Sequence, residues 1–341
     1  MKIALDVSPL SSLHSTRGIG SYTKTLLEAL KRKKGLEIIP FDKSEKIPDA
    51  DLIHYPYFDL FFPTLPIFGK DRLVITIHDV IPLVFPAYFP VGIKAYMNLI
   101  LQKIALKKRA NAVIADSRTS KTDIADKLTY PENKIHVVYL AQSNIFKPQN
   151  LKVSIREKYK LPDEFILYVG DVNWNKNILG LLEAVKLVNF PLVIVGKAVK
   201  DEKTPQSIEI KHKIQELKIG NIISLTGFVS DSDLVNIYNQ AKLTVLPSFY
   251  EGFGLPVLES MACGTPVVCS IRSSLSEIGG PAVFCDPDSP ADIANKISSV
   301  LKLSPLKYQN LREKSRVHAQ NFNSDKVAQD TIKVYKSLLK T

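Results

Sequence analysis

The sequence predicts an α/β protein built from two doubly wound, Rossmann-like domains. Short apolar segments alternate with segments of helical period along nearly the whole chain, which is typical of parallel sheets covered by helices. The chain has 341 residues, which is long for one ordinary hydrophobic core. The alternation lapses near residues 141–161 and then starts again, which indicates where one domain ends and the next begins.

The first domain is predicted over residues 1–148. Strands are expected where short apolar runs occur, and helices where apolar residues recur with the helical period. The expected strands are 2–6, 52–54, 73–77, 112–115 and 135–138. The expected helices are 20–33, 91–109 and 117–128. Residues 144–148, Asn-Ile-Phe-Lys-Pro, resemble a linker.

The second domain is predicted over residues 149–322 by the same pattern. Its expected strands are 165–169, 192–195, 222–225, 243–246, 266–269 and 282–284. Its expected helices are 179–188, 208–217, 231–240, 255–263 and 290–301. A last helix, at 324–339 within residues 323–341, lies beyond this core. Two doubly wound domains facing one another would form a central cleft, with ligands at the carboxyl ends of the strands.

The composition indicates a globular cytoplasmic protein. Hydrophobic residues make up 45% and charged residues 23% of the chain, and no run of 18 apolar residues could span a membrane. Asp6 interrupts the first apolar run too early for a signal peptide, so this run is expected to be a strand. The three cysteines, Cys263, Cys269 and Cys285, lack a C-x-x-C spacing and are expected to be reduced and buried.

The net charge of +11 is clustered at residues 31–34 and 103–109, each at the end of a predicted helix. Cations are favoured at helix C-termini, so these clusters could be plain solvated helix ends. They could also attract the anionic inner face of a membrane, which would make the protein peripheral there. No recognition module accompanies the charge, so we expect no nucleic-acid partner.

The most informative stretch of the sequence is residues 248–268. A loop with Glu251, Gly252 and Gly254 follows an apolar strand and opens a short helix, in which Pro256 suits the first turn. Gly264 suits the end of that helix, where a positive φ is needed. Such a loop presents backbone N–H groups and a positive dipole end to an anion, most often a phosphate.

Two carboxylates flank this predicted anion site, Glu251 before the helix and Glu259 about one turn inside it. They could be a glycosidase-type acid/base pair or solvated surface charges. Beside an anion, a carboxylate is useful where it accepts hydrogen bonds from hydroxyl groups, such as those of sugar and ribose.

The Glu-x7-Glu run with Gly-Phe-Gly-Leu-Pro inside it resembles the signature of retaining glycosyltransferases of the GT-B fold, family 4. The resemblance covers nearly the whole chain, and it implies that the last helix, at 324–339, packs back on the first domain. It implies that Glu251 binds hydroxyl groups of the donor sugar and that Glu259 binds the nucleotide ribose. The loop residues implied to surround the donor are Gly252, Phe253, Gly254 and Leu255.

A second glycine loop, residues 170–177, lies between a predicted strand and a predicted helix. Lys176 stands just before the helix start, where its charge opposes the dipole unless an anion is bound. In the family a lysine here binds the donor diphosphate, which implies that role for Lys176 and donor contacts for Gly170 and Asn175. Asn175 and Asp171 depart from the family pattern, in which arginine is found at these places.

Three further positions carry the resemblance. The loop at residues 17–22 contains Gly18 and Gly20, and the equivalent loop of the family closes over the donor phosphate and the acceptor. His78, in a His-Asp-x-x-Pro run, resembles the histidine that contacts the donor sugar in enzymes of polysaccharide assembly. The loop at 226–229 frames the nucleobase in the family, which implies a donor contact for Val229.

The resemblance implies a retaining, metal-independent glycosyltransferase with His78, Lys176 and Glu251 in the catalytic site. GDP-mannose is the expected donor and UDP-sugars the next candidates, with no separate cofactor. The expected acceptor is a lipid-linked glycan, as in polysaccharide or lipopolysaccharide biosynthesis. No D-x-D motif stands where a metal site would need it, and the aspartates at 286–288 are expected to cap a helix. The alternatives are a non-catalytic GT-B partner protein, a UDP-sugar 2-epimerase and an NAD-dependent oxidoreductase, the last weakened by the absent G-x-G-x-x-G.

Overall fold

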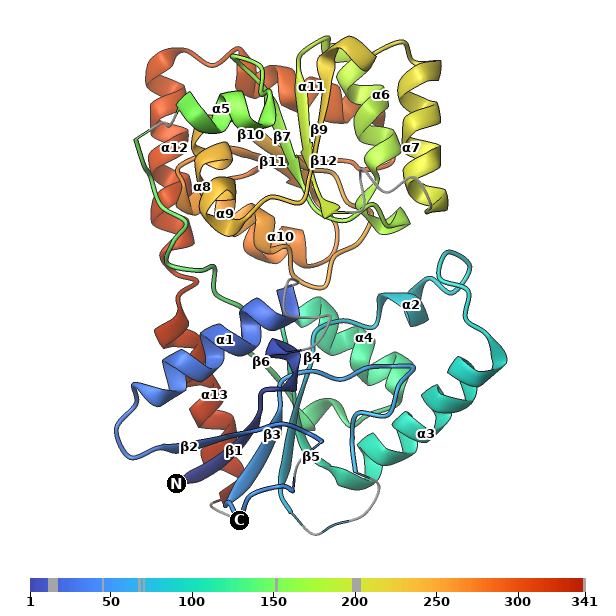
Figure 1. Cartoon of the computed structure of the whole chain (residues 1–341), viewed down its shortest axis with the longest axis vertical. Coiled ribbons are helices and arrows are strands. Elements are labelled where there is room, and N and C mark those ends of the chain that lie inside the picture. The colour runs from blue at the N-terminus through green and yellow to red at the C-terminus, as the bar shows by residue number, and fades with distance from the viewer. Residues whose placement is uncertain are drawn as a thin grey trace. The chain divides into compact units, whose positions relative to one another are not determined.

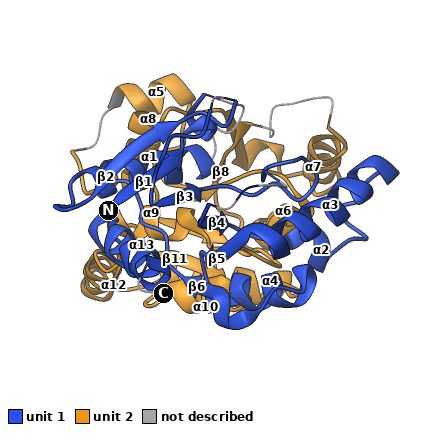
Figure 2. Ribbon diagram, turned by 90° about the horizontal axis from the view of Figure 1, so that it is seen from below, with its two compact units in different colours: residues 1–143, 322–341 blue, residues 144–321 orange. Residues whose placement is uncertain are grey.

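The computed structural model describes residues 1–11, 18–44, 46–66, 69, 71–150, 153–197 and 204–339. The chain forms two compact units, coloured separately in Figure 2. Unit 1 consists of Met1–Ser143 with Phe322–Thr341, and unit 2 of Asn144–Asn321. The division after Ser143 falls within the segment where the sequence pattern lapses, a few residues before position 148.

Unit 1 contains a parallel sheet with six strands in its described part, in the order β2-β1-β3-β4-β5-β6 (Figure 1). The strands are β1 (Lys2–Asp6), β2 (Glu37–Phe41), β3 (Leu52–Tyr55), β4 (Leu73–Ile77), β5 (Ala110–Ala115) and β6 (Ile135–Val137). The helices are α1 (Gly18–Lys31), α2 (Ile81–Val84), α3 (Ile93–Arg109), α4 (Arg118–Leu128) and α13 (Ser324–Leu339), with 3-10 turns at Ser8–Leu10 and Glu132–Lys134.

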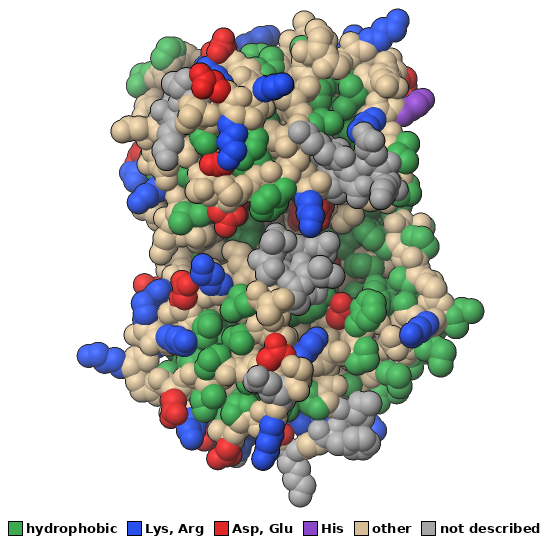
Figure 3. Space-filling view, in the orientation of Figure 1, with side chains coloured by type: hydrophobic (Ala, Val, Ile, Leu, Met, Phe, Trp, Pro, Cys, Tyr) green, Lys and Arg blue, Asp and Glu red, His purple; other side chains and the backbone are tan. Residues whose placement is uncertain are grey.

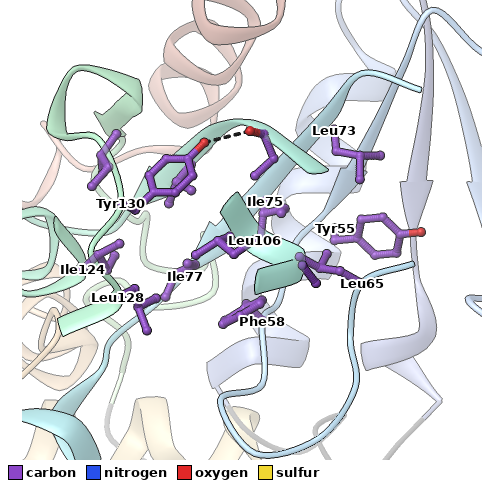
Figure 4. Packing of buried hydrophobic residues seen from close by; sticks show 14 of the residues in the cluster. Tyr55, Phe58, Leu65, Leu73, Ile75, Ile77, Leu106, Ile124, Leu128 and Tyr130 are labelled. Atoms are coloured by element: carbon purple, nitrogen blue, oxygen red, sulfur yellow. Dashed lines mark hydrogen bonds between the residues drawn. The ribbon is translucent and has the colours of Figure 1, made fainter. Parts of the chain in front are cut away.

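The sheet of unit 1 forms because its central strands are largely apolar and are buried on both faces. Every residue of β3 and β4 is buried, as a parallel sheet covered by helices on both faces requires. Figure 4 shows part of the resulting core, in which Ile75 and Ile77 of β4 pack near Leu106 of α3. The hydroxyl group of Tyr130 donates a hydrogen bond of 2.9 Å to the backbone oxygen of Ala110, so this buried polar atom is satisfied.

Unit 2 contains a second parallel sheet, with six described strands in the order β12-β11-β10-β7-β8-β9. The strands are β7 (Ile166–Val169), β8 (Leu192–Val195), β9 (Ile223–Gly227), β10 (Leu243–Leu246), β11 (Val267–Ser270) and β12 (Val283–Cys285). The helices are α5 (Val153–Tyr159), α6 (Ile178–Val188), α7 (Pro205–Glu216), α8 (Asp231–Gln240), α9 (Leu255–Ala262), α10 (Ser274–Ile278), α11 (Pro290–Leu301) and α12 (Pro305–Ala319), with 3-10 turns at Trp174–Lys176 and Gly220–Ile222.

The strand order of unit 2 is that of a doubly wound sheet, so the predicted fold class is confirmed. The direction of winding reverses between β7 and β10, the first and fourth strands of the unit. In open parallel sheets, the loops at the carboxyl ends of the two strands beside this reversal form the ligand site. The loops that follow β7 and β10 are therefore the expected ligand site of unit 2.

Several elements differ from the predictions. β2 was not expected because it contains Pro40, which lacks a backbone N–H; the strand is tolerated at an edge of the sheet. α12 was not expected because its sequence is largely polar, and only Ser315 and Ala319 are buried. The aspartates at 286–288 do not cap α11; Ser289 does, and Arg272 pairs with Asp286 and Asp288.

The C-terminal helix α13 packs on unit 1, beside α1 and β5 (Figures 1 and 2). The Lys33 ammonium group lies 2.6 Å from the Asp325 carboxylate, and the Arg32 side chain donates a 3.1 Å hydrogen bond to the Ser324 hydroxyl group. Two residues of the basic cluster 31–34 thus hold the start of α13.

A buried polar network joins α13 to the centre of the sheet. The Tyr335 hydroxyl group lies 2.6 Å from Nδ1 of His54 on β3, and Nε2 of His54 lies 2.9 Å from the Thr76 hydroxyl group on β4. The Tyr22 hydroxyl group of α1 lies 3.0 Å from the same Thr76 oxygen. Burial lowers the pKa of His54 to about 3, so its ring is neutral at physiological pH and each nitrogen depends on one of these partners.

We expect Tyr335→Phe to destabilise unit 1 by about 1–3 kcal/mol, because it leaves a buried imidazole nitrogen without a hydrogen-bond partner. The phenyl ring keeps the apolar packing, so the loss isolates the hydrogen bond. Urea denaturation followed by circular dichroism would measure it, with the exposed Tyr96→Phe as the matched control. Equal free energies of unfolding for Tyr335→Phe and Tyr96→Phe would refute the role of the network.

Candidate active site

The loops that follow β7 and β10 are joined into one structure in unit 2. The side-chain amide of Asn175 donates a 2.9 Å hydrogen bond to the Tyr250 backbone oxygen, and the Phe249 N–H donates a 2.8 Å bond to the Asn175 backbone oxygen. The rings of Trp174 and Phe249 stack with centroids 5.0 Å apart. Asn175 is only 4% exposed, so in this structure it holds the two loops together.

Lys176 and Glu251, predicted as separate ligands of the donor, form an ion pair across these loops. The Lys176 ammonium group donates to both carboxylate oxygens of Glu251, at 2.8 and 2.7 Å. The Ser248 hydroxyl group donates a further 2.7 Å bond to one of them. Glu251 is 5% exposed, and among the described residues Lys176 is the cation that pairs with this nearly buried carboxylate.

Two consecutive serines after β11 fix the backbone of the Glu251 loop. The Ser273 hydroxyl group accepts a 2.9 Å hydrogen bond from the Glu251 N–H. The Ser274 hydroxyl group lies 2.9 and 2.8 Å from the backbone oxygens of Glu251 and Phe253. Ser273 has φ 53° and ψ −146°, a backbone conformation that residues other than glycine rarely adopt. Strain of this kind persists only where the surroundings enforce it, and it is concentrated at functional sites.

Helix α9 begins at the predicted residue and ends one residue before the predicted end at 263. Gly254 precedes its first residue with φ 107°, and a Cβ atom there would lie 2.5 Å from the Leu275 side chain, so only glycine fits. Pro256 stands in the first turn, and Gly264 beyond the last residue has φ 75°. The helix therefore directs its positive dipole end toward the loop that carries Glu251.

Glu259 lies on α9 with its carboxylate bound to Tyr238 of α8. The Tyr238 hydroxyl group donates a 2.9 Å hydrogen bond to Oε2 of Glu259. Burial raises the pKa of Glu259 to about 7, against a lowering by the Tyr238 hydrogen bond. Near neutral pH the carboxyl group is consequently poised between its protonated and ionised forms, and Tyr238 orients it.

His78 lies at the carboxyl end of β4 in unit 1. Its Nδ1 is 2.7 Å from Oδ2 of Asp116, which follows β5, and its Nε2 is 3.1 Å from the backbone oxygen of Pro56. A backbone oxygen can only accept, so Nε2 carries a hydrogen. The ring also contacts Tyr22 edge-on at 4.9 Å and lies nearly parallel to Tyr57 at 6.4 Å.

His78 and Asp116 form a hydrogen-bonded pair in which the aspartate is buried and the histidine is partly buried. Burial disfavours the charged ring, but the charge of Asp116 and its hydrogen bond outweigh this and raise the pKa of His78. Burial likewise raises the pKa of Asp116, against a lowering by His78. Asp116 thus decides both the orientation and the charge of the histidine.

The remaining predicted residues lie at strand ends or helix starts of the two units. Gly170 directly follows β7, and Val229 follows β9 with its side chain buried. Gly18 and Gly20 lie in the first turn of α1, and Arg17 before them lies outside the described residues. Gly252 and Leu255 are partly exposed, whereas Phe253 is buried.

Four residues that hold the predicted side chains or loops in place were not predicted from the sequence: Asp116, Tyr238, Ser248 and Ser273. Asp116 could have been found, because it directly follows a buried strand that neighbours the strand of His78. The two serines could have been found only in part, since serines are common in loops and the unusual backbone of Ser273 leaves no mark in the sequence.

Within the described ranges, no group of three His, Cys, Asp or Glu side chains is arranged to hold a metal ion. None of the described helices is both long and apolar enough to cross a membrane.

Solved structures with the same architecture cover nearly the whole chain. Sucrose-phosphate synthase from Thermosynechococcus elongatus matches 100% of this chain and 99% of its own with a TM-score of 0.75 and 21% identity. Alr3699/HepE from Anabaena, solved in complex with UDP and glucose, matches 99% of this chain and 100% of its own with a TM-score of 0.72 and 18% identity. At these identities the likeness shows the fold, which is GT-B as predicted.

Sequence relatives are closer. O-antigen chain mannosyltransferase B of Escherichia coli is 33% identical over 283 residues, which are 79% of this chain and 71% of that protein. The serotype-specific mannosyltransferase WbdA of Escherichia coli is 28% identical over 79% of this chain, which spans only about a third of WbdA, 34% of its length. The family described as Glycosyl transferases group 1 matches residues 152–318, and Glycosyltransferase Family 4 matches residues 40–141. The chain therefore belongs to the group 1, family 4 glycosyltransferases.

Proposed function

We propose that this glycosyltransferase moves mannose from GDP-mannose to a lipid-linked glycan, with retention of the anomeric configuration and without a metal ion. The observation that carries the proposal is the Lys176–Glu251 pair on the loops at the reversal of the unit 2 sheet. Glu259 lies on α9, the helix that follows one of these loops. Among the described residues here, Lys176 is a cation for a diphosphate, and Glu251 and Glu259 are carboxylates for hydroxyl groups. The mannosyltransferase names of the relatives support the choice of sugar.

The proposed chemistry follows from the charges of this site. When the bond from the sugar to the diphosphate breaks, negative charge builds on the leaving phosphate oxygens. Lys176 and the positive end of α9 stabilise that charge, a contribution that is typically among the largest in catalysis. Glu251 holds hydroxyl groups of the sugar, and Glu259 holds those of the ribose. The acceptor hydroxyl group enters on the face of the leaving group, and a phosphate oxygen takes its proton.

A thermal-shift screen with GDP-mannose, UDP-glucose and ADP-glucose, followed by turnover with a lipid-linked oligosaccharide, tests this function. A donor at 100 times its Kd adds about 2.7 kcal/mol of stability, and we expect the largest shift with GDP-mannose. The product should carry an α-mannosyl linkage by NMR. If only UDP-sugars bind, the donor is a UDP-sugar and not GDP-mannose. If the new linkage is inverted, the enzyme inverts the anomeric configuration and does not retain it. Conversion of the sugar without acceptor would identify an epimerase, and binding without any turnover a non-catalytic partner.

We expect Glu259→Ala to weaken binding of the nucleoside diphosphate by roughly ten- to hundredfold, because a hydrogen bond to a charged acceptor contributes about 1.5–3 kcal/mol. Since burial places the pKa of Glu259 at about 7, the ionised form that accepts ribose hydroxyl groups becomes dominant above neutral pH. Affinity should therefore rise between about pH 6 and pH 8.

Calorimetry on the wild type and on Glu259→Gln would separate this effect from titration of the nucleotide itself. The amide cannot ionise, so its affinity should be low and should lack the part of the pH dependence that belongs to Glu259. Unchanged affinity in a folded Glu259→Ala protein would disprove the ribose contact.

Turnover should survive an excess of EDTA if Lys176 and the α9 dipole, rather than a divalent cation, stabilise the leaving diphosphate. The rate measured in chelator should equal the rate with added Mg²⁺ or Mn²⁺. Loss of activity in EDTA, followed by rescue with either metal, would contradict the metal-independent mechanism.

A lipid-linked acceptor requires that the enzyme work at a membrane surface, and we propose peripheral contact with the anionic inner face. The net charge of +11 supports attraction to such a surface. The basic cluster at 31–34 is less available for it than the sequence implies, because Arg32 and Lys33 are engaged with α13.

A further inference from the structure

Helix α3 of unit 1 carries an apolar face that no described part of unit 1 covers. Six of its apolar side chains are between 43% and 83% exposed. They are Ile93, Tyr96, Met97, Ile100, Leu101 and Ile104. In the view of Figure 3, hydrophobic side chains gather at the lower right edge, where Figure 1 places α3. Continuous exposed apolar surface on a soluble domain marks a place of interaction.

The exposed residues lie on one side of the helix. With 3.6 residues per turn they cover an arc of about 140°, and the buried residues of α3 lie on the opposite side. These buried residues are Leu99, Gln102, Ala105, Leu106 and Arg109. The inner side already packs on the sheet, so the outer apolar face is not needed for the core. We call the six exposed apolar residues together the α3 face.

A loop packs against the inner side of α3. Phe62 is 69% exposed, and the side-chain amide of Gln102 on α3 donates a hydrogen bond to its backbone oxygen. Asn98 donates a 2.8 Å bond to the backbone oxygen of Phe61. Gln102 lies on the buried side of the helix, so α3 fixes this loop from the side opposite the α3 face.

The charged side chains of α3 itself are all of one sign. The 17 residues of α3 include no Asp or Glu. Lys94 and Lys103 lie at the two borders between its buried and exposed sides, and Lys107 and Lys108 follow the apolar residues toward its end. Arg109, which the sequence groups with them, is buried and donates a hydrogen bond to the Gly69 backbone oxygen.

We propose that the α3 face inserts into an anionic lipid surface, with the helix lying in the plane of the membrane. An apolar stripe bordered by lysines is what such a surface binds: the stripe enters the acyl boundary and the lysines meet the headgroups. A second copy of this chain fits less well, because pairing two such faces brings lysines against lysines. This proposal rests on the peripheral membrane contact proposed above and names the surface that makes it. Binding of the α3 face to lipid requires neither the sugar donor nor the acceptor.

Sedimentation with vesicles of phosphatidylglycerol and phosphatidylcholine, without substrate, tests the proposal. The variant Met97→Gln/Ile100→Gln removes two apolar side chains at unchanged net charge, and we expect it to lower the partition coefficient at least tenfold, which is about 1.4 kcal/mol. Leu187→Gln/Leu306→Gln, with exposed side chains on α6 and α12, is the matched control and should bind as the wild type does.

The same assay separates the two basic clusters. Lys107→Gln/Lys108→Gln should weaken binding to anionic vesicles, whereas Lys31→Gln/Lys34→Gln, with the same loss of charge, should weaken it much less. Neutral vesicles should retain less of every protein. The reporter Tyr96→Trp should show a blue-shifted emission when vesicles are added.

Vesicle binding by Met97→Gln/Ile100→Gln equal to that of the wild type would overturn the proposal. So would a wild-type dimer that this variant converts to monomers, since the α3 face would then be an interface between copies. Thermal shifts with GDP-mannose, measured on the same variant, should be unchanged. Loss of the proposed donor function would appear only in that measurement, and loss of the lipid contact only in the vesicle assay.

Discussion

Lys176→Ala should lower kcat by about 10²–10³, the loss typical when one group that stabilises developing charge is removed. The lysine is proposed to face the leaving diphosphate, whose negative charge grows toward the transition state. Its loss should therefore reduce kcat as well as weaken donor binding. Steady-state kinetics with GDP-mannose would measure both effects.

The Lys176–Glu251 ion pair affects the result of this experiment, because Lys176→Ala also leaves the Glu251 charge unpaired. A double variant that removes this charge is the control. Lys176→Ala leaves the Glu251 carboxylate, 5% exposed, without its cation, and breaking a buried pair costs about 3–5 kcal/mol. The double variant Lys176→Ala/Glu251→Gln removes the unpaired charge, so it should recover stability in urea denaturation while turnover stays low. A double variant that recovered turnover together with stability would show that Lys176 acts only by holding the loop.

The alternation of apolar and helical segments was sufficient to predict the fold class. The bounds of β1, β4, β8 and β10 agree with the predicted residues, because these strands are short, apolar and buried on both sides. The pattern fails where burial is slight. β2 at the sheet edge and α12 with its polar surface lack the periodic signal that burial produces.

At the candidate site, the local backbone conformation could be predicted from the sequence, but the pairing of side chains could not. The backbone of α9 followed from Pro256 and Gly264, since these residues have few conformational alternatives. The pairing of Lys176 with Glu251 joins residues far apart in the sequence, and no spacing rule predicts it. The membrane prediction illustrates the same limit. Residues 31–34 and 103–109 look alike as basic clusters, but the fold engages Arg32 and Lys33 with α13 and buries Arg109.

His78→Ala should lower turnover by about 10²-fold or more while it leaves the affinity for free GDP unchanged. His78 is proposed to contact the sugar part of the donor, and GDP lacks that sugar. The contacts proposed for the nucleotide, Lys176 and Glu259, belong to unit 2. Removing one well-placed charge or donor near the reacting centre typically costs about 10²–10³ in kcat. His136→Ala, a half-buried histidine of the same unit, is the matched control and should retain turnover.

Asp116→Asn tests whether the charge of His78 matters beyond its position. The amide retains a hydrogen-bonding side chain at Nδ1 but removes the negative charge that raises the pKa of His78, so burial alone would then lower it. If the cationic ring contributes to turnover, wild-type kcat should fall as the pH rises through the titration of the pair, and in Asp116→Asn this fall should occur at lower pH.

Calorimetry with GDP should give one affinity for the wild type, His78→Ala and Asp116→Asn. A loss of GDP affinity in His78→Ala as large as that in Lys176→Ala, or full turnover in its absence, would show that His78 does not serve the sugar. An unshifted pH profile in Asp116→Asn would show that His78 contributes through its position and not through its charge, because the charge that Asp116 supports would then have no part in the reaction.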